Sequence, residues 1–347
     1  MKHFNVYHKK DVLAYTTIRR FVTRIGERIQ VSHGSNELHE IISGSDAKFV
    51  LFGIPEDIGI RANMGLGGAD SAWKPFLSSF LNLQSNDFFD GEEVLLLGHF
   101  DFNNLRFLIE EKAYDVDEKI DAYRHAVITI DEEVEQLAKL ITSMKKIPIA
   151  IAGGHNNAYP LIKGACKGLH KAGEIAVPQI NAINLDGHTD LRPIEGRHSG
   201  NSFRYAIEDG YLLKYYILGM NECHLPQTVW TDIATNPSIG FATFEDIFIH
   251  EKKNFIQAVA EAIDFTGDSF AGVELDLDCV ENILSSAVTP SGISTIHARQ
   301  YLRHTAAGCK PAYLHICEGA SELEDGRKSD TTGKLISYLV SDFVKGR

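Results

Sequence analysis

The amino-acid sequence predicts an α/β protein built around a central, mostly parallel β-sheet. Short apolar segments of strand length alternate along the chain with longer segments in which apolar residues recur at helical spacing. Polar and charged residues gather directly after several of the apolar segments, which is where parallel sheets bind their ligands. Because buried parallel strands are covered by helices on both faces, three layers are expected.

Seven apolar segments are expected to be strands, because each is short and apolar along its whole length. They span residues 49–54, 94–97, 147–152, 180–185, 216–220, 271–277 and 312–317. Four segments are expected to be helices, because their apolar residues recur at helical spacing. They span residues 117–144, 252–263, 293–304 and 334–344.

The first 45 residues lack this alternation; they are mixed in charge and end in the polar stretch SHGSNELHE and SGSD. We therefore interpret residues 1–45 as an N-terminal extension. No Pro-, Gly- or Ser-rich linker and no internal repeat divides the rest, so residues 46–347 are expected to form a single domain.

The charge balance is 34 basic against 47 acidic residues, a net charge of −13. This argues against nucleic acid or an anionic membrane as the main partner, since both favour a basic face. No stretch approaches the ~18 apolar residues of a membrane span, and no apolar signal segment is visible near the N-terminus. Five widely spaced cysteines without a C-x-x-C favour a reducing cytoplasm over a disulfide framework.

Five clusters of polar residues each coincide with the carboxyl end of an expected strand. His155 follows IPIAIAGG; Asp186, His188 and Asp190 follow INAINL; Asp276 and Asp278 follow AGVEL; Glu318 follows AYLHIC; and Glu56 and Asp57 follow FVLFGI. The carboxyl ends of parallel strands meet at one edge of a sheet, so these clusters are expected to converge.

The composition of these clusters predicts a metal centre. Asp186, His188 and Asp190 alternate, as do Asp276 and Asp278, so in extended segments each set would point to one side. A lone D-x-D is more often a solvated edge, and a lone histidine after two glycines is more often structural. Together with His155, however, they offer two imidazoles and four carboxylates, which suits two divalent ions ~3.5–4 Å apart. Such a pair generates hydroxide from water near neutral pH, so hydrolysis is expected.

Several segments resemble those of a known family. AGGHNNAY, NLDGHTDLR, GRHSGNSFRYAIEDG and ELDLD resemble the signature segments of the ureohydrolases, which include arginase, agmatinase and formimidoylglutamase. GIPEDIGIRANMGLGGADSAWKPFL is similar to the N-terminal part of formimidoylglutamase-like members, and the resemblance runs from about Phe49 to near the C-terminus. It implies a three-layer α/β/α fold, two Mn²⁺ ions, a small-molecule substrate and assembly as a trimer or hexamer.

The resemblance also implies roles for individual residues. One ion would be held by His155, Asp186, Asp190 and Asp276, and the other by Asp186, His188, Asp276 and Asp278. Glu318 matches the glutamate that receives the planar amidine or guanidinium group, which a carboxylate can bind through two parallel hydrogen bonds.

This chain departs from the family pattern without losing a ligand. Ala152 and Gly187 are mild changes, Glu274 stands where Ser or Thr is usual, and Glu281 and Asn282 replace Asp-Pro. Arginases and agmatinases carry a histidine in the loop after D-x-H-x-D, and here Ser199 occupies that place with His198 before it. His198 is our candidate acid–base residue, because imidazole titrates near neutral pH. A loop histidine that only donates or accepts a structural hydrogen bond is the alternative.

The expected reaction is attack of hydroxide on an amidine or guanidine carbon, with Asp190 and then His198 carrying a proton to the leaving nitrogen. Arg61 and Arg192 could bind a substrate carboxylate, and Asn201, Asn221 and Glu222 resemble substrate-loop positions. For each of these five residues a solvated or packing role is the alternative.

The sequence favours hydrolysis of N-formimino-L-glutamate to L-glutamate and formamide, a step of histidine degradation. The alternative within the family is a urea-releasing guanidino hydrolase, in which Glu222 or Glu56 would bind a cationic substrate tail. A third hypothesis is a non-catalytic metal-binding protein with the same fold. The departures from the family pattern at Glu274, Glu281 and Ser199 favour it.

Overall fold

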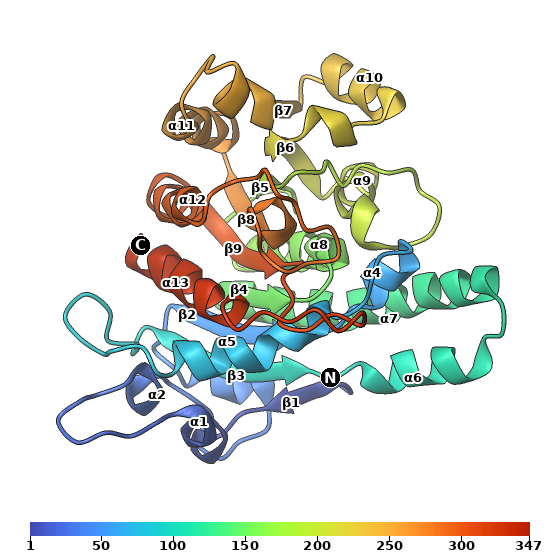
Figure 1. Ribbon diagram of the computed structural model, residues 1–347. Helices are drawn as coiled ribbons and strands as arrows, with labels where there is room; N and C mark the ends of the chain where they lie inside the picture. Colours follow the sequence, from blue (N-terminus) through green and yellow to red (C-terminus); the bar gives the residue numbers. More distant parts are fainter.

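The computed structural model describes residues 1–347 and contains one nine-stranded sheet (Figure 1). The strand order is β1-β3-β2-β4-β9-β8-β5-β6-β7, and every strand pair except β1–β3 is parallel. The strands are β1 Phe4–Val6, β2 Phe49–Ile54, β3 Val94–Phe100, β4 Ile147–Ala152, β5 Ile180–Leu185, β6 Leu212–Met220, β7 Ile239–Thr243, β8 Phe270–Asp276 and β9 Lys310–Cys317. The mostly parallel sheet and all seven expected strands are confirmed. β1 and β7 were missed, because the first has only three residues and the second is only partly buried.

Thirteen α-helices surround the sheet. They are α1 Lys9–Tyr15, α2 Ile25–Arg28, α3 Leu38–Ser43, α4 Ile58–Ala62, α5 Trp73–Phe80, α6 Asn103–Lys112, α7 Val116–Ser143, α8 Ala158–Lys171, α9 Ser202–Glu208, α10 Gln227–Thr235, α11 Phe255–Thr266, α12 Thr295–Gly308 and α13 Thr332–Lys345. The four helices expected from the sequence correspond to α7, α11, α12 and α13. Short turns are η1 Ala69–Ala72, η2 His155–Asn157, η3 Ser199–Asn201, η4 Glu222–His224, η5 Glu245–Ile249 and η6 Leu277–Cys279.

Helix α8 was not expected because Pro160, Gly164 and Gly168 weaken its helical pattern. Packing explains the last of these residues. A Cβ atom on Gly168 would lie 1.9 Å from Thr142 Oγ1 on α7, so only glycine permits this approach of the two helices. Tertiary packing here outweighs helix propensity, which single-sequence reasoning cannot anticipate.

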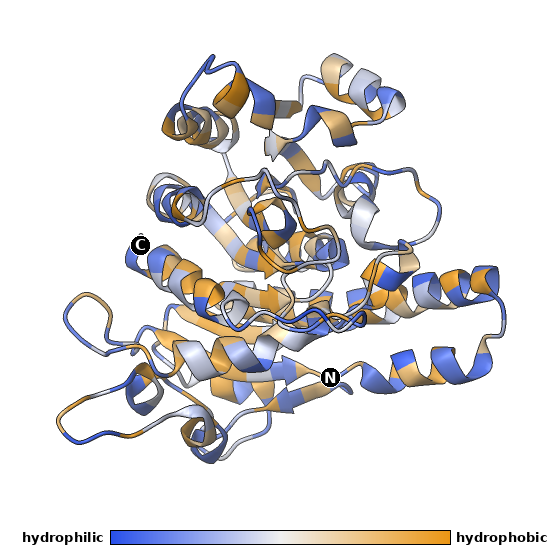
Figure 2. Ribbon diagram, in the orientation of Figure 1, coloured by the Kyte–Doolittle hydropathy of each residue, from blue (hydrophilic) through white to orange (hydrophobic).

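Helices cover both faces of the sheet, as expected (Figure 1). Helices α5, α11, α12 and α13 close one face over a cluster of 48 buried apolar residues. Helices α7, α8 and α9 close the other face over a second cluster of 44. The strands between them are predominantly apolar, whereas the outer helices alternate in hydropathy (Figure 2). Two separate cores therefore hold the sheet rigid from both sides.

Residues 1–45 pack against one edge of the sheet. β1 pairs antiparallel with β3, and Val12, Ile25, Ile29 and Val31 join the first apolar cluster. The segment interpreted as an extension thus contributes to the same core. The domain boundary at residue 46 stays a prediction.

None of the helices combines the length and the apolar character needed to cross a bilayer. All five cysteines are free.

The order of the strands places four carboxyl ends side by side at the centre of the sheet. After β4 the chain crosses to β5, β6 and β7 and then returns to insert β8 and β9 between β4 and β5. Such a change of direction leaves a crevice beyond the strand ends, in which open α/β sheets bind ligands. Four of the five clusters expected from the sequence therefore meet at one place; the fifth, Glu56 and Asp57, follows β2 outside these four strands.

Candidate metal centre and active site

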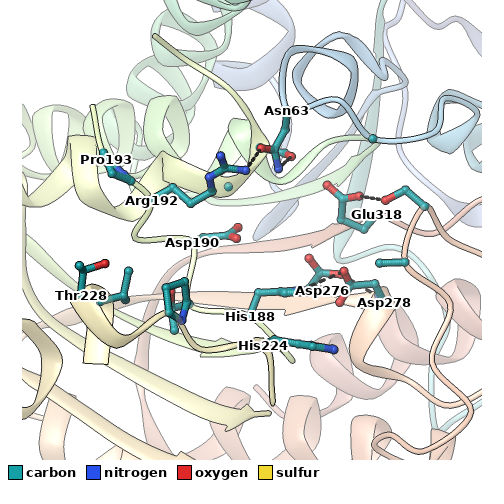
Figure 3. A pocket seen from close by; sticks show the side chains of 18 residues that line it. Asn63, His188, Asp190, Arg192, Pro193, His224, Thr228, Asp276, Asp278 and Glu318 are labelled. Atoms are coloured by element: carbon teal, nitrogen blue, oxygen red, sulfur yellow. Dashed lines mark hydrogen bonds and ion pairs between the residues drawn. The ribbon is translucent and has the colours of Figure 1, made fainter. Parts of the chain in front are cut away.

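A cavity of about 550 Å³ lies beyond the carboxyl ends of β5, β8 and β9 (Figure 3). Eighteen residues line it, and only two are hydrophobic. His188, Asp190, Asp276, Asp278 and Glu318 face into it, together with Arg192 from the loop after β5. A polar cavity with several convergent carboxylates is suited to cations and hydrogen-bonding ligands rather than apolar ones.

His155 occupies the first position after the Gly-Gly turn that ends β4. Gly153 is required there, because a Cβ atom would lie 1.8 Å from the carbonyl oxygen of Glu56. The imidazole is 1% exposed. Its Nδ1 lies 2.9 Å from Asp190 Oδ2, 3.1 Å from Asp276 Oδ2 and 3.4 Å from Asp186 Oδ2. Four of the six predicted ligands thus meet around one nitrogen.

His188 forms a second group with Asp278, the remaining carboxylate, and with Asp186, which both groups share. Its Nδ1 lies 3.2 Å from Asp278 Oδ2 and 3.6 Å from Asp186 Oδ1. Asp186 therefore directs one oxygen toward His188 and the other toward His155. A carboxylate placed between two ligand groups is the arrangement that a bridging ligand needs.

The side chains converge by turns rather than by strand alternation. Asp186 Oδ1 accepts the backbone N–H of His188 at 2.6 Å, and Asp276 Oδ1 accepts that of Asp278 at 2.7 Å. Asp190 adopts φ +49°, in the left-handed region. The expectation of two extended segments was wrong, because aspartate side chains bond the backbone two residues on and turn the chain at the strand end.

The four carboxylates fit a divalent metal centre. Their only ion-pair partners are the two imidazoles, with no lysine or arginine. Asp278 Oδ1 is buried and has no hydrogen-bond partner. Burial, together with the neighbouring carboxylates, raises the pKa of Asp190 and Asp276. Such a concentration of buried negative charge requires compensating cations, and oxygen and imidazole donors suit hard to borderline divalent ions.

Glu318 stands just beyond the end of β9, beside Asp276 of the neighbouring strand β8 (Figure 3). It adopts φ +63°, a strained conformation for a glutamate. Its Oε1 accepts the backbone N–H of His155 at 2.9 Å, and Oε2 lies 3.4 Å from Ser286 Oγ. Burial raises its pKa to about 8, so a cationic partner would favour its ionised form.

Arg192 lies across the cavity from Glu318 (Figure 3). Its Nη1 donates to Asn63 Oδ1 at 2.7 Å, and its Nη2 donates to Glu195 Oε1 at 3.1 Å. Asn63 also donates to Ser199 Oγ at 3.3 Å. The cavity therefore holds a guanidinium and a carboxylate apart from each other, both beside the metal-ligand cluster (Figure 3).

Comparison with known proteins identifies the family. A profile of the arginase family matches residues 47–343. The chain belongs to the arginase family. The formimidoylglutamase of Streptococcus pyogenes is 27% identical over 237 residues, which cover 65% of this chain and 70% of that protein.

Solved structures of the arginase family share the fold. The formimidoylglutamase of Bacillus subtilis gives a TM-score of 0.69 at 17% identity and covers 95% of this chain and 94% of that one. The Trypanosoma cruzi formiminoglutamase solved with Mn²⁺ gives 0.70 at 18% identity, covering 94% and 98%. The predicted resemblance and arginase-like fold are thus confirmed. As an arginase-family member, the chain is a hydrolase of carbon–nitrogen bonds in linear amidines.

Arg61 does not line the cavity of this arginase-family protein, contrary to prediction. Its guanidinium pairs with Asp57 at 2.8 Å through Nη2 and also with Glu324. These contacts join α4 to the loop before α13. They leave no pair of guanidinium N–H groups free to bind a substrate carboxylate. Asp57 is one turn away in sequence, but Glu324 is not foreseeable from local spacing.

The other three proposed substrate residues do not line the main cavity either. Asn201 is buried and accepts from Arg197 Nη1 at 2.9 Å. Asn221 caps η4 by accepting the backbone N–H of Cys223, and Glu222 contacts Thr243. Glu56, suggested for a cationic tail, is buried and binds the side chains of Asn156 and Asn157.

His198 is wholly buried and is not brought to the cavity. Its Nδ1 accepts the backbone N–H of Gly200 at 3.1 Å, and its Nε2 lies 3.3 Å from Glu195 Oε1. It therefore has the structural role that was the alternative to acid–base catalysis. Through Glu195 it supports the loop that carries Arg192.

Burial, with Arg192 nearby, lowers the pKa of His198 to about 4. The unfolded chain takes up this proton below about pH 6.5, whereas the native state does not until about pH 4. We expect His198→Asn, whose Oδ1 can replace Nδ1, to reduce the loss of unfolding free energy between pH 7.5 and 5 by about 1–2 kcal/mol. Urea unfolding of metal-free protein measures this. The exposed His39→Asn is the control, and equal slopes in all three proteins would contradict the prediction.

His224 is a cavity residue that the sequence analysis missed. It lies in η4 with its ring stacked on that of His188, the centroids 4.9 Å apart and the planes inclined by 12°. Asn63 was missed as well, although it belongs to a segment that carries the family resemblance. Neither residue comes directly after an apolar strand, and that position was the pattern that predicted the other residues of the site.

Proposed function

We propose that this protein is a binuclear manganese hydrolase that converts N-formimino-L-glutamate to L-glutamate and formamide. The observation that carries the proposal is the presence of Arg192 and Glu318 at separate places in the cavity that also contains the metal ligands. A substrate with an amidine at one end and carboxylates at the other matches this distribution of charge. The names of the Streptococcus and Bacillus relatives support the same substrate.

The metal ions would be held by the two groups of ligands. His155, Asp186, Asp190 and Asp276 would hold one ion; Asp186, His188, Asp276 and Asp278 would hold the other. Manganese is proposed because the Trypanosoma cruzi relative was solved with it. When bound, such a pair lowers the pKa of water and supplies hydroxide near neutral pH.

The chain's own residues would bind and orient the amidine. Glu318 would accept two N–H groups of the planar N–C–N fork, which places the amidine carbon over the ligand cluster. Asp190 lines the cavity and would carry a proton to the leaving nitrogen. The predicted second carrier, His198, is not proposed, since its side chain lies outside the cavity.

Arg192 would bind a substrate carboxylate through its guanidinium, held in place by Asn63 and Glu195. We expect Arg192→Met to raise KM about 10–100-fold, because a charge-assisted hydrogen-bonded contact contributes about 1.5–3 kcal/mol. Steady-state kinetics with manganese measure this. Arg303→Met, an exposed arginine on α12, is the control, and an unchanged KM in Arg192→Met would contradict the assignment.

A substrate panel tests the function. Manganese-loaded protein is incubated with N-formimino-L-glutamate, arginine and agmatine, and formamide and urea are quantified. We expect formamide from the first and no urea from the others. The acids that line the cavity are Asp190, Asp276, Asp278 and Glu318; all are assigned to the metal ions or to the amidine, so none is left to receive a cationic tail. Urea release with no turnover of formiminoglutamate would establish a guanidino hydrolase instead. No turnover in any reaction would favour a non-catalytic protein.

A further inference from the structure

Glu274 is a buried carboxylate directly behind the metal-ligand cluster. It lies in β8, two residues before Asp276, and is 0% exposed. Its Oε1 accepts from the hydroxyl of Tyr313 at 2.5 Å, and its Oε2 lies 2.5 Å from His315 Nδ1. Both partners come from β9, where His315 pairs with Glu274 across the sheet. The sequence marked this position as a departure from the usual Ser or Thr.

The same carboxylate faces the back of His155. His155 Nε2 lies 3.5 Å from Glu274 Oε2, is buried and has no hydrogen-bond partner. On the opposite side of the ring, Nδ1 faces Asp186, Asp190 and Asp276. A neutral imidazole that donates its lone pair to a metal through Nδ1 must carry its proton on Nε2. That proton needs an acceptor, and Glu274 supplies the nearest carboxylate.

We propose that Glu274 is a positioning residue that holds His155 as the Nε2–H tautomer. It thereby increases the affinity for the ion that His155, Asp186, Asp190 and Asp276 would hold. This role rests on the proposed function, because it concerns one of its two metal sites. A serine or threonine hydroxyl can donate as well as accept, so it leaves the tautomer free. An ionised carboxylate only accepts, and it also raises the basicity of the imidazole.

The neighbours of Glu274 fit this role. It pairs with no lysine or arginine; the titratable partners of the carboxylate are His155, His315 and the hydroxyl of Tyr313. A buried carboxylate must be hydrogen-bonded and paired to be tolerated. Tyr313 and His315 satisfy its hydrogen bonds, and a metal-bound imidazole would offset its charge. Glu274, Tyr313 and His315 thus form one hydrogen-bonded group. A serine at position 274 would not need the two donors from β9.

Manganese titration of Glu274→Gln, followed by the electron paramagnetic resonance signal of free Mn²⁺, tests the proposal. Glutamine keeps the shape but has one acceptor oxygen for three donors. We expect one of the two manganese sites to weaken about 10–100-fold, the range found for changes in the partners of metal-bound histidines. The other site, held by His188 and not by His155, should change less than about threefold.

Tyr313→Phe is the matched control, because it removes one hydrogen bond to the same carboxylate but keeps the charge beside His155. We expect lower thermal stability with both manganese sites retained. Unchanged sites in Glu274→Gln, or an equal loss in Tyr313→Phe, would overturn the proposal.

A second measurement avoids dependence on a variant that fails to fold. ¹⁵N spectra of histidine-labelled wild-type protein loaded with diamagnetic Zn²⁺ report both ring nitrogens of His155, assigned with His155→Asn. We expect Nδ1 to bind the metal and Nε2 to carry the proton, and metal binding through Nε2 would overturn the proposal. Failure of the wild-type protein to bind two manganese ions would instead contradict the proposed function, whatever tautomer is found.

Discussion

Replacing Asp276 with asparagine should remove bound manganese and lower kcat by at least about a thousandfold, equivalent to about 4 kcal/mol of transition-state stabilisation. Asp276 Oδ2 lies 3.1 Å from His155 Nδ1, and Asp276 is assigned to both ions. Asparagine can still accept the N–H of Asp278 through Oδ1, so the turn after β8 is preserved. The substitution therefore removes charge without removing the local structure.

The same substitution should stabilise the metal-free protein. Burial, followed by the charges of Asp278 and Asp186, raises the pKa of Asp276 well above its usual range. Its ionised form is therefore unfavourable at neutral pH when no cation is present. We expect the Tm of metal-free Asp276→Asn to exceed that of metal-free wild type, although the manganese-dependent rise in Tm is lost.

Metal analysis, Tm with and without manganese, and turnover measure these effects together. Asp268→Asn is the control, because Asp268 precedes β8 at the far end of the strand and its side chain is 55% exposed. It should retain both ions and wild-type activity. Two manganese ions per chain in Asp276→Asn would refute the assignment of the ligands.

The convergence of the site could be predicted because it follows from a local pattern and one topological rule. His155, Asp186, Asp276 and Glu318 come at or just beyond the ends of apolar strands, and parallel strands place those ends together. No residue-to-residue contact had to be known. The strand order was not needed either, although it explains why these four strands are neighbours.

Some of the features that could not be placed from the sequence depend on distant partners. Arg61 looked available because its partner Glu324 lies 263 positions away in the chain. His198 looked catalytic because loop position does not reveal whether a ring faces the cavity or the protein interior. β1 is too short to show a period, yet pairing with β3 recruits it into the sheet. A long-range contact decided the outcome for Arg61 and β1, whereas His198 is held by its sequence neighbours Glu195 and Gly200.

Glu274 shows the reverse situation, in which the sequence marked a departure and the structure supplied its physical meaning. From the sequence it could be seen only as a charged residue on the stripe that contains Asp276 and Asp278. Its partners Tyr313 and His315 lie on β9, and only the β8–β9 pairing connects them.

Glu318→Gln should separate substrate binding from metal binding. We expect both manganese ions to remain, because Glu318 is not assigned as a ligand, while kcat/KM falls about a hundredfold to a thousandfold. The carboxylate would offer two equivalent acceptors to an amidinium fork, whereas glutamine offers one acceptor and one donor that opposes the substrate's N–H groups. Loss of a bidentate, charge-assisted contact at the reacting group affects the transition state directly.

The variant should fold, because glutamine Oε1 can still accept the backbone N–H of His155. Ser286→Ala is the control: it removes the hydroxyl 3.4 Å from Glu318 Oε2 but leaves the carboxylate, and we expect less than about a fivefold change in kcat/KM. Steady-state kinetics and metal analysis on the same preparations distinguish the outcomes. Loss of manganese in Glu318→Gln would make Glu318 part of the metal centre, whereas wild-type kcat/KM with both ions bound would place the amidine elsewhere in the cavity.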